Sequence, residues 1–109
     1  MYETKLNTRI VKGEEIETWE REIYDANVLT VEVGTNGYKG GDSGHGSRVY
    51  LRFTDEGGTD FNARVQTTPY GNTTEIEITL GGDAELSTMI KALKFALKVL
   101  KEQSRETGK

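Results

Sequence analysis

A glycine-rich segment, Gly34 to Arg48, gathers most of the side chains in this sequence that could take part in chemistry. It reads GTNGYKGGDSGHGSR and contains the only histidine, His45. Its Gly41-Asp-Ser-Gly44 run matches the nucleophile motif of trypsin-like serine proteases. A catalytic triad, however, needs a histidine base and a separate carboxylate that orients it. His45 lies two residues from Ser43, and the chain is too short for the double barrel of such a protease, so the match is a coincidence.

Anion binding suits the segment better, because glycine-rich turns can aim successive N–H groups into one concavity. Lys39 and Arg48 supply positive charge, Arg48 can hold a phosphate with two N–H groups, and Tyr38 or Trp19 could stack on a base. A strand rather than a helix follows, so the segment is not a Walker loop or a dinucleotide fingerprint. The residues expected to bind the ligand are Thr35, Asn36, Tyr38, Lys39, Gly40, Gly41, Asp42, Ser43, His45, Ser47 and Arg48.

Three alternatives stay open for this segment. The first is a purely structural hairpin loop, stiffened by Asp42 and Ser43 bonding to their own backbone, and it has about equal support. The second is a small phosphoesterase that uses His45. The third, a metal site at His45 and Asp42 beside Asp55 or Asp60, is weaker because one histidine with scattered carboxylates is not a specific ligand set. We therefore expect no catalytic residue, metal or cofactor.

Composition limits the classes of function. The 109 residues form a single domain, and 14 Lys and Arg against 18 Asp and Glu give a net charge of −4. This balance argues against nonspecific binding to nucleic acid, which needs a broad basic surface. The chain has no cysteine, which excludes disulfides and thiolate metal sites. No signal peptide or membrane span is recognisable, so we expect a cytoplasmic protein with no membrane partner.

The glycine-rich segment lies between two strand-like runs, 28–33 and 49–53. An alternating pattern predicts an edge strand over 3–11, followed by a Lys12-Gly13 hairpin turn. The run 14–24 fits a helix or a strand, and the preceding turn favours a strand. Strands are also predicted at 61–67 and 74–80, the latter with Ile76, Ile78 and Leu80 turned inward. The last long element is a helix from Ala84 to about Ser104, with Asp83 placed to cap it.

These elements predict an α+β fold, an antiparallel β-sheet of about five strands packed against one long C-terminal helix. Within the single domain 1–109 we expect a β-sheet region at 1–82 with the glycine-rich loop 34–48, a helix at 83–104 and a tail at 105–109. The predicted sheet-facing stripe of the helix is Leu86, Met89, Ile90, Leu93, Ala96, Leu97 and Leu100.

The apolar surface of this helix is wider than one sheet contact requires. Ala92, Phe95 and Val99 lie beside the stripe, and we assign them to a homo-oligomer interface; a helix deep in its own core explains them equally well. A row of Lys91, Lys94, Lys98 and Lys101 is interpreted as a solvated face. A structural or protein-interaction domain that docks a partner through this helix is the main alternative function.

Residues 28–53, VLTVEVGTNGYKGGDSGHGSRVYLRF, resemble a motif of small uncharacterised proteins from bacteria and their phages. The chain is also similar to small phage proteins that sequester nucleotide immune signals, such as cyclic ADP-ribose derivatives. The similarity lies in size, in a sheet combined with C-terminal helical structure, and in oligomers with pockets between subunits. It implies ligand capture and assigns no residue. The expected function is a non-enzymatic binding module that captures a small phosphorylated, nucleotide-derived signal.

Overall fold

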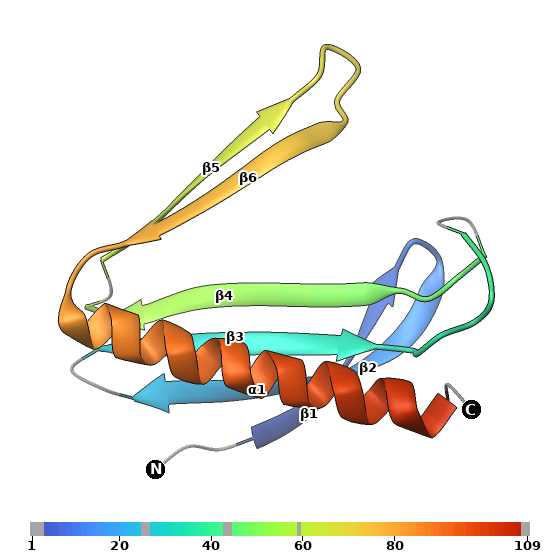
Figure 1. Ribbon diagram of the computed structural model, residues 1–109, viewed down its shortest axis with the longest axis horizontal. Coiled ribbons are helices and arrows are strands. Elements are labelled where there is room, and N and C mark those ends of the chain that lie inside the picture. Colours follow the sequence, from blue (N-terminus) through green and yellow to red (C-terminus); the bar gives the residue numbers. More distant parts are fainter. Residues whose placement is uncertain (1–3, 25–26, 43–44, 59, 108–109) are drawn as a thin grey trace.

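The computed structural model describes residues 4–24, 27–42, 45–58 and 60–107. It confirms the α+β class, with antiparallel strands and one C-terminal helix (Figure 1). Instead of about five strands in one sheet, the described residues form six strands in two separate sheets. In chain order the elements are β1 (Thr4–Val11), β2 (Glu14–Tyr24), β3 (Val28–Thr35), β4 (Val49–Gly57), β5 (Phe61–Thr67), β6 (Thr73–Leu80) and α1 (Asp83–Thr107).

The main sheet is a four-stranded meander in the order β1-β2-β3-β4. The β1–β2 connection is the predicted hairpin turn, because Lys12 and Gly13 both have positive φ angles, 49° and 84°. Two consecutive residues of this kind match the twist of the flanking strands. The hairpin confirms that residues 14–24 form a strand, with Trp19 paired to Leu6 of β1 and to Val33 of β3.

The hydrophobic core lies between α1 and the main sheet. Leu29, Val31 and Val33 alternate along β3 and are fully buried beneath the helix. The helix turns Ala92 and Val99 toward them, and the small Ala92 side chain lets the two backbones approach closely. The helix begins at Asp83 as predicted but continues to Thr107, so the residues expected as a tail from 105 are helical up to that point.

The helix is rotated relative to the sequence-based expectation. Ala92, Phe95 and Val99, assigned to an oligomer interface, are at most 7% exposed and belong to the core of a single chain. Much of the predicted sheet-facing stripe is instead between 46% and 62% exposed, namely Leu86, Ile90, Leu93 and Leu97. We call these four residues the helix stripe. The assignment failed because apolar residues cover more than half of the helix circumference, so their periodicity does not identify the buried third.

The opposite face of the main sheet is organised around a buried carboxylate. Glu32 alternates with Val31 and Val33 on β3 and therefore points away from the helix. Both of its oxygens accept hydrogen bonds from Arg9 of β1, each at 2.6 Å, and Thr18 of β2 donates a third at 2.6 Å. The Arg9 guanidinium also lies 5.2 Å from the Tyr50 ring centroid, which brings the outer strands β1 and β4 together.

The remaining hairpin, β5–β6, projects from the molecule as a two-stranded arm (Figure 1). We call residues 61–80 the arm. Cross-strand pairing places Val65 opposite Ile76 and Ala63 opposite Ile78 on one face. On the other face, Arg64 donates hydrogen bonds to Glu75 and Glu77. The predicted alternation of β6 is confirmed, but its expected inward face is wrong, because Ile76 and Ile78 are 62% and 41% exposed.

The Glu32 cluster generates a pH-dependent prediction. The hydrogen bonds from Arg9 hold the pKa of Glu32 below its ordinary value, against the opposing effect of burial. A depressed carboxyl pKa stabilises the fold at pH values above the unfolded-state pKa, and this contribution is lost as the pH falls through the folded-state pKa. Glu32→Gln should lower the free energy of unfolding by about 2 kcal/mol near neutral pH, because charge-assisted hydrogen bonds to a buried carboxylate are lost. The Arg9 side chain is 34% exposed, so water partly solvates the charge left behind.

Urea unfolding of the wild type and of Glu32→Gln at a series of pH values tests this. The stability difference should shrink as the pH falls below about 4, where the unfolded carboxyl becomes protonated. Glu15→Gln, an exposed change on β2, serves as the control and should show no such trend. A difference between wild type and Glu32→Gln that is independent of pH would contradict the assigned cause.

Candidate functional site

The glycine-rich loop joins β3 to β4 and contains a tight turn. The amides of His45 and Gly46 both donate to the Asp42 carbonyl oxygen. Gly46 is buried, and a Cβ atom there would lie 2.7 Å from that same oxygen, so a side chain does not fit. Gly37 and Gly40 have φ angles of 83° and 76°, which favour glycine. Ser43 and Gly44 lie outside the described residues.

The predicted ligand-binding residues at the start of the loop hold the structure together. Asn36 Oδ1 accepts a 2.7 Å hydrogen bond from the Arg48 amide, which closes the base of the loop. The Thr35 amide donates to Gln103 Oε1 at 2.8 Å, and Gln103 in turn donates to the Glu17 carbonyl. The loop is therefore anchored to α1 and β2, and Thr35 and Asn36 are largely engaged by the protein itself.

Arg48 also acts within the protein. Its side chain is buried, and its guanidinium donates to the carbonyl oxygens of Gly46 at 2.8 Å and Lys12 at 3.4 Å. These bonds connect the glycine-rich loop to the β1–β2 turn. The structure thus places the predicted phosphate-gripping arginine as an internal clamp, with its donors turned toward main-chain carbonyls.

Among its described residues, the exposed part of the loop offers few converging groups. Tyr38, Lys39 and Asp42 project into solvent, as do Gly40, Gly41, His45 and Ser47. His45 Nδ1 lies 3.3 Å from Asp42 Oδ1, but both side chains are more than four-fifths exposed, so the contact contributes little. Lys39 shares a hollow with Glu15 and Glu17. Two carboxylates beside one lysine oppose phosphate binding there.

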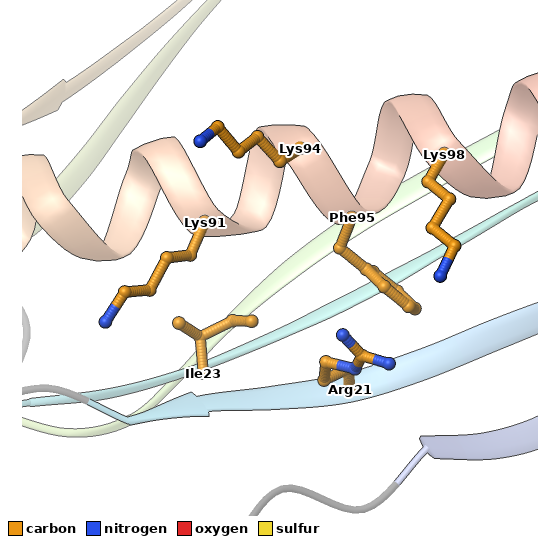
Figure 2. A pocket seen from close by; sticks show the side chains of 6 residues that line it. All are labelled: Arg21, Ile23, Lys91, Lys94, Phe95 and Lys98. Carbon is orange, nitrogen blue, oxygen red and sulfur yellow. The ribbon is translucent and has the colours of Figure 1, made fainter.

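A second, more basic hollow lies between β2 and α1 (Figure 2). It has a volume of about 380 Å³ and is lined by Arg21, Ile23, Lys91, Lys94, Phe95 and Lys98. The helical spacing i, i+3 and i+7 places the three lysines on one flank of α1. Figure 2 shows Lys91 and Lys98 descending toward β2 on either side of Phe95, whereas Lys94 extends away from them. No carboxylate is among these six lining residues.

Arg21 is held in place at the floor of this hollow. Its guanidinium carbon lies 4.5 Å from the Phe95 ring centroid, a cation–π geometry. Its Nε donates to Thr4 Oγ1 at 3.0 Å. Among the residues that the structure describes, no side chain is bonded to its two Nη atoms. The fork of donors on Arg21 is therefore positioned before any ligand arrives.

A smaller hollow of about 190 Å³ continues from the first and shares Arg21, Phe95 and Lys98 with it. Trp19 and Glu102 line this end. We call the two hollows together the basic groove. It combines a cationic end with an aromatic end that also carries a hydrogen-bond acceptor.

Sequence reasoning missed most of this groove. The lysine row on α1 was assigned to a solvated face, and Arg21 lay in the run whose structure was ambiguous. The spacing of Lys91, Lys94 and Lys98 could have marked a basic flank, but only the packing shows that Arg21 and Trp19 lie beneath it. No group of three or more His, Cys, Asp or Glu residues that could hold a metal ion occurs in the described part of the chain. No described helix is long and apolar enough to cross a membrane.

No protein-family model, curated protein or solved structure matches the chain. The geometry of the chain itself is therefore the basis for inferring its function.

The contacts of Arg48 predict a structural role. Arg48→Ala should lower the free energy of unfolding by about 2 kcal/mol, because buried main-chain carbonyl groups lose their donor. Urea denaturation measures the change, with Lys39→Ala as the matched control, since Lys39 is an exposed cation of the same loop. An Arg48→Ala protein as stable as the control would show that the clamp has no energetic importance.

Proposed function

We propose that this protein is a non-enzymatic binding module that captures a small phosphorylated ligand, and that the basic groove holds the phosphate. The observation that carries the proposal is that four cationic residues line one hollow, namely Arg21, Lys91, Lys94 and Lys98. The chain as a whole has a net charge of −4, so the positive charge of this hollow is opposite in sign to the net charge of the protein.

The cationic end suits phosphate for two reasons. Lysine ammonium groups act as compact point charges, whereas the planar guanidinium of Arg21 can donate two parallel hydrogen bonds to one phosphate. A hollow of about 380 Å³ also falls within the range of small-molecule sites. Its six described lining residues include no pair of side chains that could serve as nucleophile and general base, which favours capture over turnover.

The aromatic end favours a nucleotide-derived ligand over free phosphate. Trp19 offers a ring on which a base can stack, and stacking of this kind contributes about 1–3 kcal/mol per base. Glu102, at the same end, can accept a hydrogen bond from a ribose hydroxyl or an exocyclic amine. The glycine-rich loop then acts mainly as a rigid connection, with Lys39 as its exposed cation.

Binding is tested with inorganic phosphate and a panel of linear and cyclic nucleotides. Isothermal titration measures affinity, and Trp19 is the only tryptophan of the chain, so its fluorescence reports on the aromatic end. A nucleotide should change this fluorescence, whereas inorganic phosphate should bind more weakly and leave it nearly unchanged.

Arg21→Gln and Lys98→Gln should each weaken nucleotide binding by about tenfold or more, because each removes a charge-assisted hydrogen bond. Lys101→Gln lies on the same helix outside the groove, and Lys39→Gln lies in the glycine-rich loop; both should bind as the wild type does. Weaker binding by Lys39→Gln alone would transfer the site to the loop. Failure of every phosphorylated compound to bind would contradict the proposed function.

A further inference from the structure

Two exposed apolar surfaces of this chain have no covering within the described residues. The first is one face of the arm, formed by Phe61, Ala63, Val65, Ile76, Ile78 and Leu80. Val65, Ile76 and Ile78 are between 41% and 62% exposed. A hairpin of two strands is marginally stable by itself, and it needs another surface to pack against. We call this set of residues the arm face.

The second surface combines the helix stripe with strand β4. The helix packs over β3 and β2. On the same side of the sheet, Phe53 of β4 packs against the edge of the core, but other apolar side chains of β4 remain exposed. Val49 and Leu51 of β4 point to the helix side of the sheet, whereas Tyr50 between them points to the other face. Val49 and Leu51 are 57% and 51% exposed. Successive helical residues are rotated by about 100°, so Lys91 and Leu93 lie on opposite sides of the buried Ala92. Lys91 lies on the β2 side. Leu93 and the rest of the helix stripe therefore lie on the flank of α1 that faces β4.

The arm face and this body surface open toward the same space. Phe61, at the base of the arm, lies 6.4 Å from Phe53 of β4, ring centroid to ring centroid. Phe53 is on the helix side of the main sheet, since it pairs with Val31. The arm face therefore continues the apolar side of the main sheet, and the arm diverges from β4 as a wedge (Figure 1).

The extent of the chain indicates what fills this wedge. The accessible surface is 7313 Å², about 1,300 Å² more than the roughly 6,000 Å² expected for a compact monomer of this mass. The radius of gyration is 15.2 Å, against about 13 Å for a compact domain of this length. A stable dimer buries about 800 Å² on each partner, so the excess is enough for a self-association interface.

We propose that the protein is a homodimer in which two copies exchange arms. Each arm face covers the helix stripe and β4 of the other copy. Because the two copies are related by a two-fold axis, both apolar surfaces of each copy are covered in the dimer. A second copy suits the wedge because each chain carries both complementary surfaces. The ion-paired face of the arm, with Arg64, Glu75 and Glu77, stays in water.

This inference is independent of the proposed function. The basic groove lies on the β2 flank of α1, opposite the helix stripe, so arm exchange leaves it open. Variants that break the dimer should therefore keep the ability of the groove to bind ligand.

The absence of cysteine from the sequence allows a direct test. One chain carries Val65→Cys in the arm face and a second chain, distinguishable by mass, carries Leu93→Cys in the helix stripe. After mixing, a short bis-maleimide should join the two different chains. Val65→Cys mixed with Ile10→Cys is the control, because Ile10 is exposed on β1 at the far edge of the main sheet, and it should not cross-link. Equal yields from both pairs would overturn the proposal.

Light scattering coupled to size exclusion gives a second measure. The wild type should have twice the mass of one chain, and Ile76→Asp or Leu93→Asp should shift it to monomer. Tyr70→Asp, at the 90% exposed tip of the arm, should leave the dimer intact. A wild type that stays monomeric, forms open-ended assemblies or binds lipid vesicles in place of a second copy would overturn the proposal, as would a dimer that persists in Ile76→Asp and Leu93→Asp.

Discussion

The constraint on which this structure depends is that one helix covers only part of one sheet. A helix with its side chains is about 10 Å across, whereas the outer strands of a four-stranded sheet lie about 14 Å apart. Here α1 packs on β3 and reaches β2. The uncovered remainder differs on its two sides, with a cationic groove beside β2 and apolar side chains beside β4. Both functional proposals follow from this asymmetric placement.

On the other face of the main sheet no described helix packs, and polar groups rather than apolar side chains connect the strands there. Glu32 sits on the central strand β3, where a carboxylate would be costly without partners. Arg9 and Thr18 supply three hydrogen bonds to it. Because Arg9 comes from β1 and also lies over Tyr50 of β4, the cluster links the edges of the sheet. A polar network thus connects the strands on a face that the main hydrophobic cluster does not reach.

Features set by neighbouring residues could be predicted from the sequence, whereas features set by long-range packing could not. The Lys12-Gly13 turn fixed the β1–β2 hairpin, and strict alternation identified β6, because turn geometry and period-two patterning are properties of neighbouring residues. The rotation of α1 was mispredicted because Leu93 and Phe95 are equally apolar, and only the sheet beneath selects one of them. The same holds for the site. The candidate residues of the loop are close together in the sequence, between Gly34 and Arg48, so their pattern could be recognised. The groove brings together Arg21 and Lys98, which are seventy-seven residues apart.

The contrast between loop and groove shows why composition alone is a weak guide to an anion site. The loop contains glycines, hydroxyls and two cations. However, its Arg48 donates hydrogen bonds to main-chain carbonyl groups, and its Lys39 shares a hollow with two glutamates. The described lining of the groove contains no glycine and no sequence motif, yet four cations and no carboxylate are among the six described residues that line its larger hollow. Phosphate affinity depends on the direction of donors and on the sign of neighbouring charges. By this criterion the helix flank is the stronger candidate. The glycines serve the tight turn within the loop, and Arg48 connects that turn to the β1–β2 turn.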